Sequence, residues 1–161
     1  MMELYHGSNI RIEKPDFAFC KPFKDFGKGF YLSAEKEQAL DLAKQRVRET
    51  HEGKPIINVF SFDESLMTSG ELKVLTFDDY SEEWVKFVLA NRDLHGIQPY
   101  HNYDIVYGPI ADDSVTFQLR RYQRGVIRTI PELIDELRFH KGITFQYFFG
   151  TQRALDKLTR L

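Results

Sequence analysis

The sequence has a single cysteine, Cys20, and no apolar run approaching the ~20 residues of a membrane-spanning helix. One cysteine excludes an intrachain disulfide and a cysteine-based zinc site, and we interpret Cys20 as an inert thiol. An excess of one charge is also missing, because 22 basic residues stand against 24 acidic ones. The net charge of −2 gives no general attraction to nucleic acid or to an anionic membrane. The N-terminus lacks the features of a signal peptide, so we expect a cytoplasmic protein with no membrane partner.

What the sequence does contain is typical of an ordinary globular protein, with 42% hydrophobic and 29% charged residues. Its 161 residues fit one domain, residues 1–161, because no repeat, low-complexity stretch or linker divides them. The 14 phenylalanines and 8 tyrosines favour strands. We therefore predict an α+β protein with a sheet-rich core.

The spacing of apolar residues predicts the elements in outline. Strands are expected at 2–8, 30–32, 56–62, 72–77, 103–110 and 143–149. Helices are expected after N-caps at Ser33 and Ser81, over 115–122, from Pro131 at the first helical position, and over 152–161.

Two segments stand out as candidates for ligand binding. Tyr5-His6-Gly7-Ser8 places an imidazole at a strand end, beside a glycine backbone that a ligand can approach closely. Residues 26–33, Phe-Gly-Lys-Gly-Phe-Tyr-Leu-Ser, put a lysine between two glycines and an aromatic residue on the strand that follows. The spacing of these glycines fits neither a dinucleotide-binding fingerprint nor a P-loop.

Together the two segments resemble the ADP-ribosyltransferase superfamily of the His-Tyr-Glu type, which includes diphtheria-like toxins and poly(ADP-ribose) polymerases. The chain is more closely similar to a bacterial family of unknown function that is assigned to this fold. The stretches that carry this resemblance are Leu4–Ser8, Asp25–Ser33, Val88–Arg92, Tyr103–Asp113 and Gln146–Leu155. The resemblance implies two small packed antiparallel sheets that form an NAD cleft and are flanked by helices.

The resemblance also implies a role for each matching residue. His6 would hydrogen-bond the adenosine ribose of NAD, the Gly7 backbone with Ser33 would hold the nicotinamide amide, and Tyr31 would stack on the nicotinamide ring. The remaining NAD-binding positions implied by the match are Ser8, Gly29 and Phe30. The reaction of such a site is substitution at the anomeric carbon of the nicotinamide ribose, through a transition state that resembles an oxocarbenium ion.

The third motif of the superfamily is altered in this chain. The glutamate that contacts the ribose 2′-OH corresponds to Gln146, so the implied catalytic set is His6, Tyr31 and Gln146. An amide accepts the hydrogen bond of the 2′-OH, but it carries no charge and cannot act as a base. The loss of that charge is expected to weaken transfer by about 3 kcal/mol, the scale of one electrostatic stabiliser.

The resemblance therefore predicts mono-ADP-ribosyl transfer from NAD to a macromolecular acceptor, protein or nucleic acid, with release of nicotinamide. Because Gln146 replaces the glutamate, the alternative of a non-catalytic module that binds NAD or ADP-ribose stays open. An NAD glycohydrolase or an RNA 2′-phosphotransferase on the same fold is a further alternative, although no set of basic residues for the phosphate is evident near the motifs. By analogy with toxins of this superfamily, a neutralising partner is conceivable.

Other polar residues have ordinary structural interpretations. His95 and His101 lack compact metal-ligand spacing with Asp93 and Asp104, so we expect solvated loop histidines and no metal. We expect the basic run Arg120–Arg128 to be a solvated face rather than a phosphate-binding patch. Asn91 and Asp104 fit a ligand contact and a structural hydrogen bond equally well.

Overall fold

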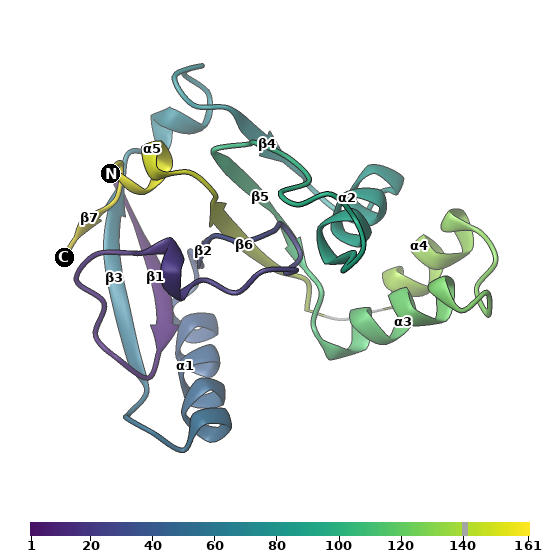
Figure 1. Cartoon of the computed structure of the whole chain (residues 1–161), viewed down its shortest axis with the longest axis horizontal. Coiled ribbons are helices and arrows are strands. Elements are labelled where there is room, and N and C mark those ends of the chain that lie inside the picture. The colour runs from purple at the N-terminus through teal and green to yellow at the C-terminus, as the bar shows by residue number, and fades with distance from the viewer. Residues whose placement is uncertain (140–141) are drawn as a thin grey trace.

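A computed structural model describes residues 1–139 and 142–161, and it has the predicted α+β architecture (Figure 1). One sheet has the order β1 (Met2–Ser8), β3 (Ile56–Phe62), β7 (Thr159–Arg160). The other has the order β2 (Phe30–Leu32), β6 (Thr144–Phe149), β5 (Ile105–Ile110), β4 (Val74–Thr76). The helices in these residues are α1 (Lys36–Thr50), α2 (Glu82–Arg92), α3 (Asp113–Gln123), α4 (Ile130–Arg138) and α5 (Gln152–Leu155). None of them is long and apolar enough to cross a membrane.

The sheets are mostly antiparallel, which corrects the expectation of two purely antiparallel sheets. The exception is the pair β4 and β5, whose strands run parallel in the register Val74↔Ile105. The physical reason is α2, which lies between β4 and β5 in the sequence. This helix returns the chain to the end of the sheet at which β4 begins, so β5 can run in the same direction as β4. The strands are also shorter than predicted, beginning at Val74 and Ile105 instead of at residues 72 and 103.

The two sheets pack face to face across a layer of aromatic side chains, which we call the inner core. Phe30 of β2 meets Phe60 of β3 edge to face at 5.6 Å between ring centroids, and Phe62 meets Phe149 of β6 at 5.3 Å. Leu4 of β1 belongs to the same buried cluster. The alternation of strand residues therefore delivers one face of each sheet to a shared apolar layer.

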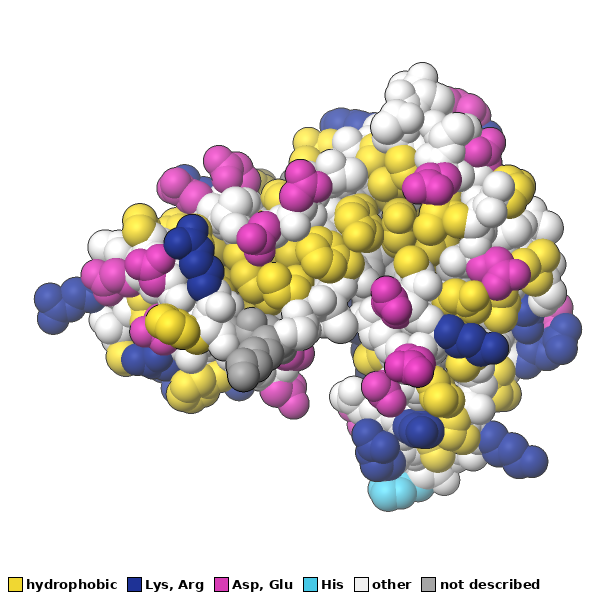
Figure 2. Space-filling model, turned by 180° about the vertical axis from the view of Figure 1, so that it is seen from behind, with side chains coloured by type: hydrophobic (Ala, Val, Ile, Leu, Met, Phe, Trp, Pro, Cys, Tyr) yellow, Lys and Arg dark blue, Asp and Glu magenta, His cyan; other side chains and the backbone are white. Residues whose placement is uncertain are grey.

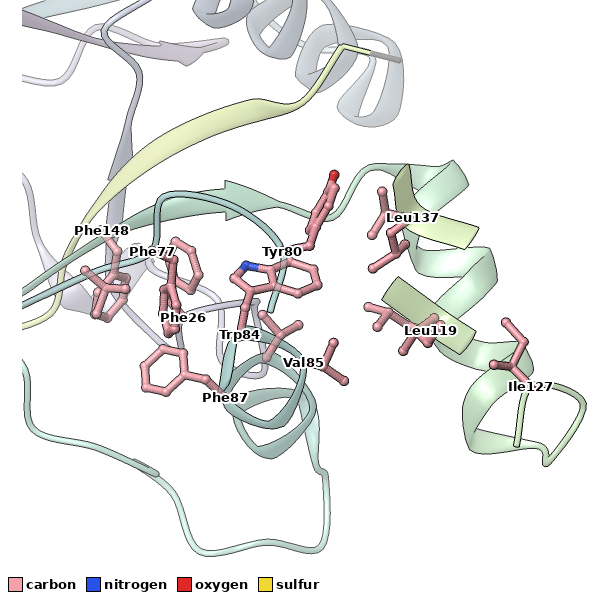
Figure 3. Close-up of a cluster of buried hydrophobic side chains, with 14 residues drawn as sticks. Phe26, Phe77, Tyr80, Trp84, Val85, Phe87, Leu119, Ile127, Leu137 and Phe148 are labelled. Carbon is pink, nitrogen blue, oxygen red and sulfur yellow. The ribbon is translucent and has the colours of Figure 1, made fainter. Parts of the chain in front are cut away.

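The opposite face of the four-stranded sheet is covered by helices over a second apolar layer, the helix-side core (Figure 3). Trp84 of α2 is fully buried there, and its indole nitrogen donates to the Pro109 carbonyl at 2.9 Å. Phe26 and Phe148 pack in this layer from the loop before β2 and from β6. Helices α3 and α4 extend the layer to one end of the molecule (Figure 1).

Viewed from behind, the surface is hollowed between the part that carries α1 and the part that carries α3 and α4 (Figure 2). Hydrophobic side chains gather along the band above this hollow, and acidic side chains are scattered over it. Lysines and arginines lie mainly toward the periphery in this view.

The helix starts confirm one predicted cap and correct two predictions. Ser81 caps α2 as expected, accepting a hydrogen bond from the Trp84 amide at 3.1 Å. Ser33 does not cap α1, whose N-cap is Glu35. The backbone of Ser33 is held in an extended bridge to Tyr5, so the helix can begin only after that bridge. Pro131 is the second residue of α4 rather than the first, because the helix begins at Ile130.

The predicted helix over residues 152–161 is wrong beyond Leu155. Helix α5 ends there, and Thr159 and Arg160 form β7, which pairs with Ser61 and Phe60 at the free edge of β3. The guanidinium of Arg160 also donates to the carbonyls of Ile12 and Val59 at 3.0 and 3.1 Å. Backbone pairing at an open strand edge thus overrides the helical spacing of the local sequence.

Gly7 marks the closest approach of α1 to β1. A Cβ at this position would lie 2.8 Å from the backbone nitrogen of Ala43 and would collide with the carbonyl oxygen of Ala39. Because these are backbone atoms, only displacement of the whole helix could relieve the overlap. Gly7 therefore sets the spacing between α1 and the first sheet.

We expect Gly7→Ala to lower the free energy of unfolding by about 3 kcal/mol, the upper range for overpacking a tight contact. Urea denaturation followed by circular dichroism measures the change. Gly70→Ala is the matched control, because a Cβ there meets nothing within 4 Å, although its φ of +83° is unfavourable for alanine. Equal losses in the two variants would contradict a tight α1–β1 contact.

Candidate functional site

The two predicted motifs meet where β1 runs beside β2. Tyr5 and Ser33 exchange backbone hydrogen bonds of 2.8 Å in both directions, which joins the two sheets at this point. The next residue along β1 is His6, whose Nδ1 lies 2.6 Å from the Tyr31 carbonyl oxygen. This bridge thus brings residues of the first and second motifs into contact.

His6 is held as a neutral ring with a defined tautomer. Because a carbonyl can only accept, Nδ1 carries the proton and Nε2 is left as an acceptor. The ring stacks on Phe30 with centroids 4.3 Å apart. Burial lowers the pKa of His6 to about 4, against the opposing effect of the bond to Tyr31, and the charges of Lys24 and Arg46 lower it further. The imidazole can therefore accept a hydrogen bond at neutral pH.

Tyr31 uses its hydroxyl to fix the glycine-containing loop before β2. The hydroxyl accepts from the Phe26 amide at 3.0 Å and donates to the Gly27 carbonyl at 2.7 Å. Burial raises the pKa of this hydroxyl well above its ordinary value, so it stays protonated. The ammonium of Lys24 lies over the ring, 5.5 Å from its centroid. The ring of Tyr31, and not its hydroxyl, is the group left to contact a ligand.

The rings of His6, on β1, and Tyr31, on β2, pack toward different faces of β2. His6 stacks on Phe30, which faces the inner core, whereas Tyr31 packs against the helix-side core. The contact between these two residues is therefore the hydrogen bond to the Tyr31 backbone. A ligand that touched both rings would have to pass around the edge of β2.

Gln146 lies on the same side of the sheet as Tyr31. Gln146 and Phe148 are two residues apart on β6, so their side chains lie on the same face of the sheet. Phe148 is paired with Tyr31 across the two strands, which places Tyr31 on that face as well. Gln146 faces Gly108 of β5, and the space above that glycine is filled by Phe26 and Phe77. The β2–β6 pairing ends at Leu32 and Tyr147; Ser33 directly follows Leu32, and Gln146 directly precedes Tyr147. Strand register therefore brings Gln146 close to the second motif.

Gln146 is 7% exposed as a residue, and no hydrogen bond of its side-chain amide is found in the described part of the chain. Among residues 1–139 and 142–161, the fully buried side-chain polar atoms that lack a hydrogen-bond partner are Tyr80 Oη and Asn91 Oδ1. Gln146 is not one of them, so its amide keeps some contact with solvent. A ligand at this face could satisfy it.

The other predicted NAD-binding positions have structural roles of their own. Ser33 is 2% exposed, and its hydroxyl accepts from the Glu35 amide and donates to Gln38 at 2.5 Å. The Ser8 hydroxyl accepts from the Ile10 amide. Phe30 is buried in the inner core. A Cβ on Gly29 would lie 2.6 Å from the Phe149 carbonyl oxygen, so this glycine permits β6 to pack closely.

The loop before β2 is also anchored to α2. Asp25 is 5% exposed and forms an ion pair with Arg92, whose Nε donates at 2.6 Å, and its other oxygen accepts from the Ala111 amide at 2.8 Å. Neither Asp25 nor Arg92 stands out in the sequence, although both lie in stretches that carry the family resemblance. Their 67-residue separation left no local signal.

Asn91 and Asp104, left open by the sequence, have structural bonds. Asn91 donates to the Phe87 carbonyl at 2.8 Å. Asp104 accepts from the Lys73 amide at 2.7 Å and from Thr151 and Arg153 at 2.5 Å each. Burial opposes ionisation of Asp104, but these donors outweigh it and hold the pKa of the carboxyl below its usual value. Asp104 therefore connects the start of β5 to the residues before β4 and after β6.

A basic cluster beside His6 escaped the sequence analysis. Burial lowers the pKa of Lys24, the charges of Lys21 and Arg46 lower it further, and Asp25 opposes this in part. Lys24 and Arg46 also act on His6. No ion pair to Lys21, Lys24 or Arg46 is found within the residues described. The three lie in a loop and on α1, so only the fold reveals that they form one group.

A shallow hollow of about 540 Å³ lies elsewhere, between α2, β4 and the loop before β5. His6, Tyr31 and Gln146 do not line it. Its wall includes His101, which the sequence suggested was a solvated loop residue. That suggestion is wrong, because Nε2 of His101 bonds the Phe26 carbonyl at 2.7 Å and Nδ1 accepts from the Tyr103 amide at 3.0 Å.

No cluster of three or more potential metal-binding side chains occurs in residues 1–139 and 142–161.

The fold and site define an α+β protein with two small, mostly antiparallel sheets joined at a His-Gly-Ser strand. The chain belongs to the family described as protein of unknown function DUF3990, whose model matches residues 2–159. No curated protein and no solved structure is significantly similar to the chain.

The low pKa of His6 makes stability depend on pH. The folded protein binds this proton more weakly than the unfolded chain does, so the contribution of neutral His6 is complete above pH 6.5 and is lost as the pH falls toward 4. We expect the loss to reach roughly 3 kcal/mol across this range. His6→Phe should lack this part of the pH dependence.

Denaturant unfolding of both proteins at pH 7, 5.5 and 4 measures the difference. NMR titration of the imidazole gives an independent value, with His6 still unprotonated at pH 5.5. An ordinary histidine titration in the folded protein would contradict the buried, Nδ1-protonated ring.

Proposed function

We propose that the junction of β1, β2 and β6 binds NAD and transfers its ADP-ribose to a macromolecular acceptor, with release of nicotinamide. The observation that carries the proposal is the contact between the two sequence motifs, where His6 bonds the Tyr31 carbonyl and the ammonium of Lys24 lies 5.5 Å from the centroid of the Tyr31 ring. The pyrophosphate of NAD is an anion that this ammonium can bind next to the two motifs.

His6 contributes an acceptor in this proposal. Its Nδ1 proton is committed to the Tyr31 carbonyl, so Nε2 accepts a hydrogen bond from a ribose hydroxyl. In the hydrogen bond to the adenosine ribose that the resemblance implies, His6 is therefore the acceptor. The neutral state also limits repulsion with Lys24 and Arg46, which a charged imidazole would add to.

Tyr31 contributes the face of its ring. Its hydroxyl bonds to Phe26 and Gly27 fix the ring plane in advance, which favours ordered stacking of the nicotinamide. Lys24 now covers the ring at 5.5 Å. On binding, its ammonium would exchange this contact for the stronger one with phosphate oxygens.

Gln146 contributes the amide that accepts the ribose 2′-OH. As a neutral group it orients the sugar but gives no charge stabilisation to the developing cation. That property favours a second candidate function, binding of NAD or ADP-ribose without rapid turnover. The two candidates differ in one observable, the release of nicotinamide.

We expect Gln146→Glu to raise nicotinamide release about ten-fold or more, because a carboxylate stabilises the oxocarbenium-like transition state. Gln146→Ala should lower it. The measurement is chromatography of nicotinamide for wild type and both variants, with and without cell lysate, and radiolabelled NAD identifies the acceptor. If only the Glu variant releases nicotinamide, the native protein is the binding module. Equal rates in all three proteins would exclude Gln146 from the reacting ribose.

NAD affinity by calorimetry tests the site itself. Lys24→Ala should weaken binding about ten-fold through the loss of a charge-assisted contact. Lys36→Ala, an exposed lysine at the start of α1, is the matched control and should bind as wild type does. Unchanged affinity in Lys24→Ala and His6→Ala would exclude the junction as the NAD site.

A further inference from the structure

The hollow beside α2 is built largely from aromatic rings. Phe87 of α2 is one of its lining residues, and three rings from the loop before β5 contact the Phe87 ring at centroid distances of 5.9, 4.8 and 6.4 Å: Tyr100, His101 and Tyr103. Tyr100 is 51% exposed, so its ring is accessible from solvent. The volume of about 540 Å³ falls within the ~300–1,000 Å³ of small-ligand sites.

His101 takes part in this wall only as a ring. Both of its nitrogens are used within the protein, Nε2–H toward the Phe26 carbonyl and Nδ1 as the acceptor of the Tyr103 amide. Burial lowers the pKa of His101, with the charge of Lys73 acting in the same direction, so the ring is uncharged. It can stack on a flat ligand, but it offers no free nitrogen to a metal or a proton.

The charges around the hollow select an anion. Lys73 and Lys86 line it against a single carboxylate, Glu83. The ammonium of Lys73 already lies over the Tyr103 ring, 4.8 Å from its centroid. A cationic ligand that stacked on this ring would therefore be repelled by the charge of Lys73. Lys86 is paired with Glu82 at 3.0 Å on an exposed surface. Such surface pairs contribute little, so this ammonium can turn to another anion.

Aromatic walls together with two lining ammonium groups match a nucleotide. We propose that the hollow between α2 and residues 100–103 is a nucleotide-binding site, in which the base stacks on the exposed ring of Tyr100 and the phosphate lies between Lys73 and Lys86. Asn102 is exposed on the same wall, and its amide oxygen accepts from Lys73. The amide nitrogen of Asn102 remains available to the edge of the base.

This site is separate from the junction of β1, β2 and β6, and the inference does not rest on the proposed function. The two sites are nevertheless connected by the loop before β2. His101 in the nucleotide wall bonds the Phe26 carbonyl, and the Phe26 amide bonds the Tyr31 hydroxyl. A free nucleotide and a nucleotide within single-stranded nucleic acid share the required chemistry.

NMR titration of the full chain with 5′-AMP tests the proposal. We expect saturable shifts of the backbone signals of residues 100–103, and weaker binding of adenosine and of ribose 5-phosphate, each of which lacks one half of the recognised group. An octamer of single-stranded oligoadenylate binding at least ten-fold more tightly at low salt identifies nucleic acid as the source. Equal or weaker binding of the octamer identifies the free nucleotide.

Variants localise the site. Tyr100→Ala and Lys86→Ala should each weaken AMP binding about ten-fold, the scale of one lost stacking or phosphate contact. Phe117→Ala, an exposed aromatic residue on α3, and Lys36→Ala are the matched controls. Lys24→Ala should leave the shifts of residues 100–103 unchanged, which separates this site from the NAD junction. Absence of AMP-induced shifts there, or shifts that persist in Tyr100→Ala at wild-type affinity, would overturn the proposal.

Discussion

The pair of backbone hydrogen bonds between Tyr5 and Ser33 is the constraint on which the arrangement of the two sheets depends. It fixes the edge of β1 against the end of β2, so His6 falls beside the Tyr31 carbonyl. The same bridge keeps Ser33 extended and delays the start of α1 to Lys36. Helix α1 then reaches back along β1 and brings Arg46 toward His6. One pair of bonds thus relates the imidazole, the tyrosine and the basic cluster.

The glycines of the two motifs have a clear physical basis in packing. Gly7 lets α1 approach β1, and Gly29 lets β6 lie against the strand start. A glycine-rich motif that resembles a ligand-binding signature therefore also satisfies close backbone packing. The resemblance to ADP-ribosyltransferases and the close packing of the backbone involve the same residues.

Much of the fold follows from the sequence. The strands at Met2–Ser8, Phe30–Leu32 and Ile56–Phe62 match the prediction, because clear apolar patterns and turn residues bound them. The prediction failed where distant partners decide the outcome. The end of the chain becomes β7 because β3 offers it a free edge, and β4 runs parallel to β5 because of the intervening helix.

The same reasoning applies to the candidate site. His6 and Tyr31 were evident as motif residues, and the structure brings them into contact. The basic cluster was not, because Lys21 and Lys24 are separated from Arg46 by the second motif and much of α1. The aromatic walls of the hollow at α2 were also missed, since Phe87 and Tyr100–Tyr103 belong to different elements. Sets of residues that are assembled by tertiary packing leave no periodic signal in a single sequence.

The position of β6 in the four-stranded sheet has a consequence for how the protein is made. This strand lies between β2 and β5, yet it is the last of the four in the chain. During synthesis, β2 has no partner in its sheet until residues 144–149 have left the ribosome. The aromatic face of β2 therefore stays uncovered until then, and closure of the sheet requires pairing between strands far apart in sequence, which is slow. Nascent chains of this protein are expected to depend on protection from aggregation until β6 emerges.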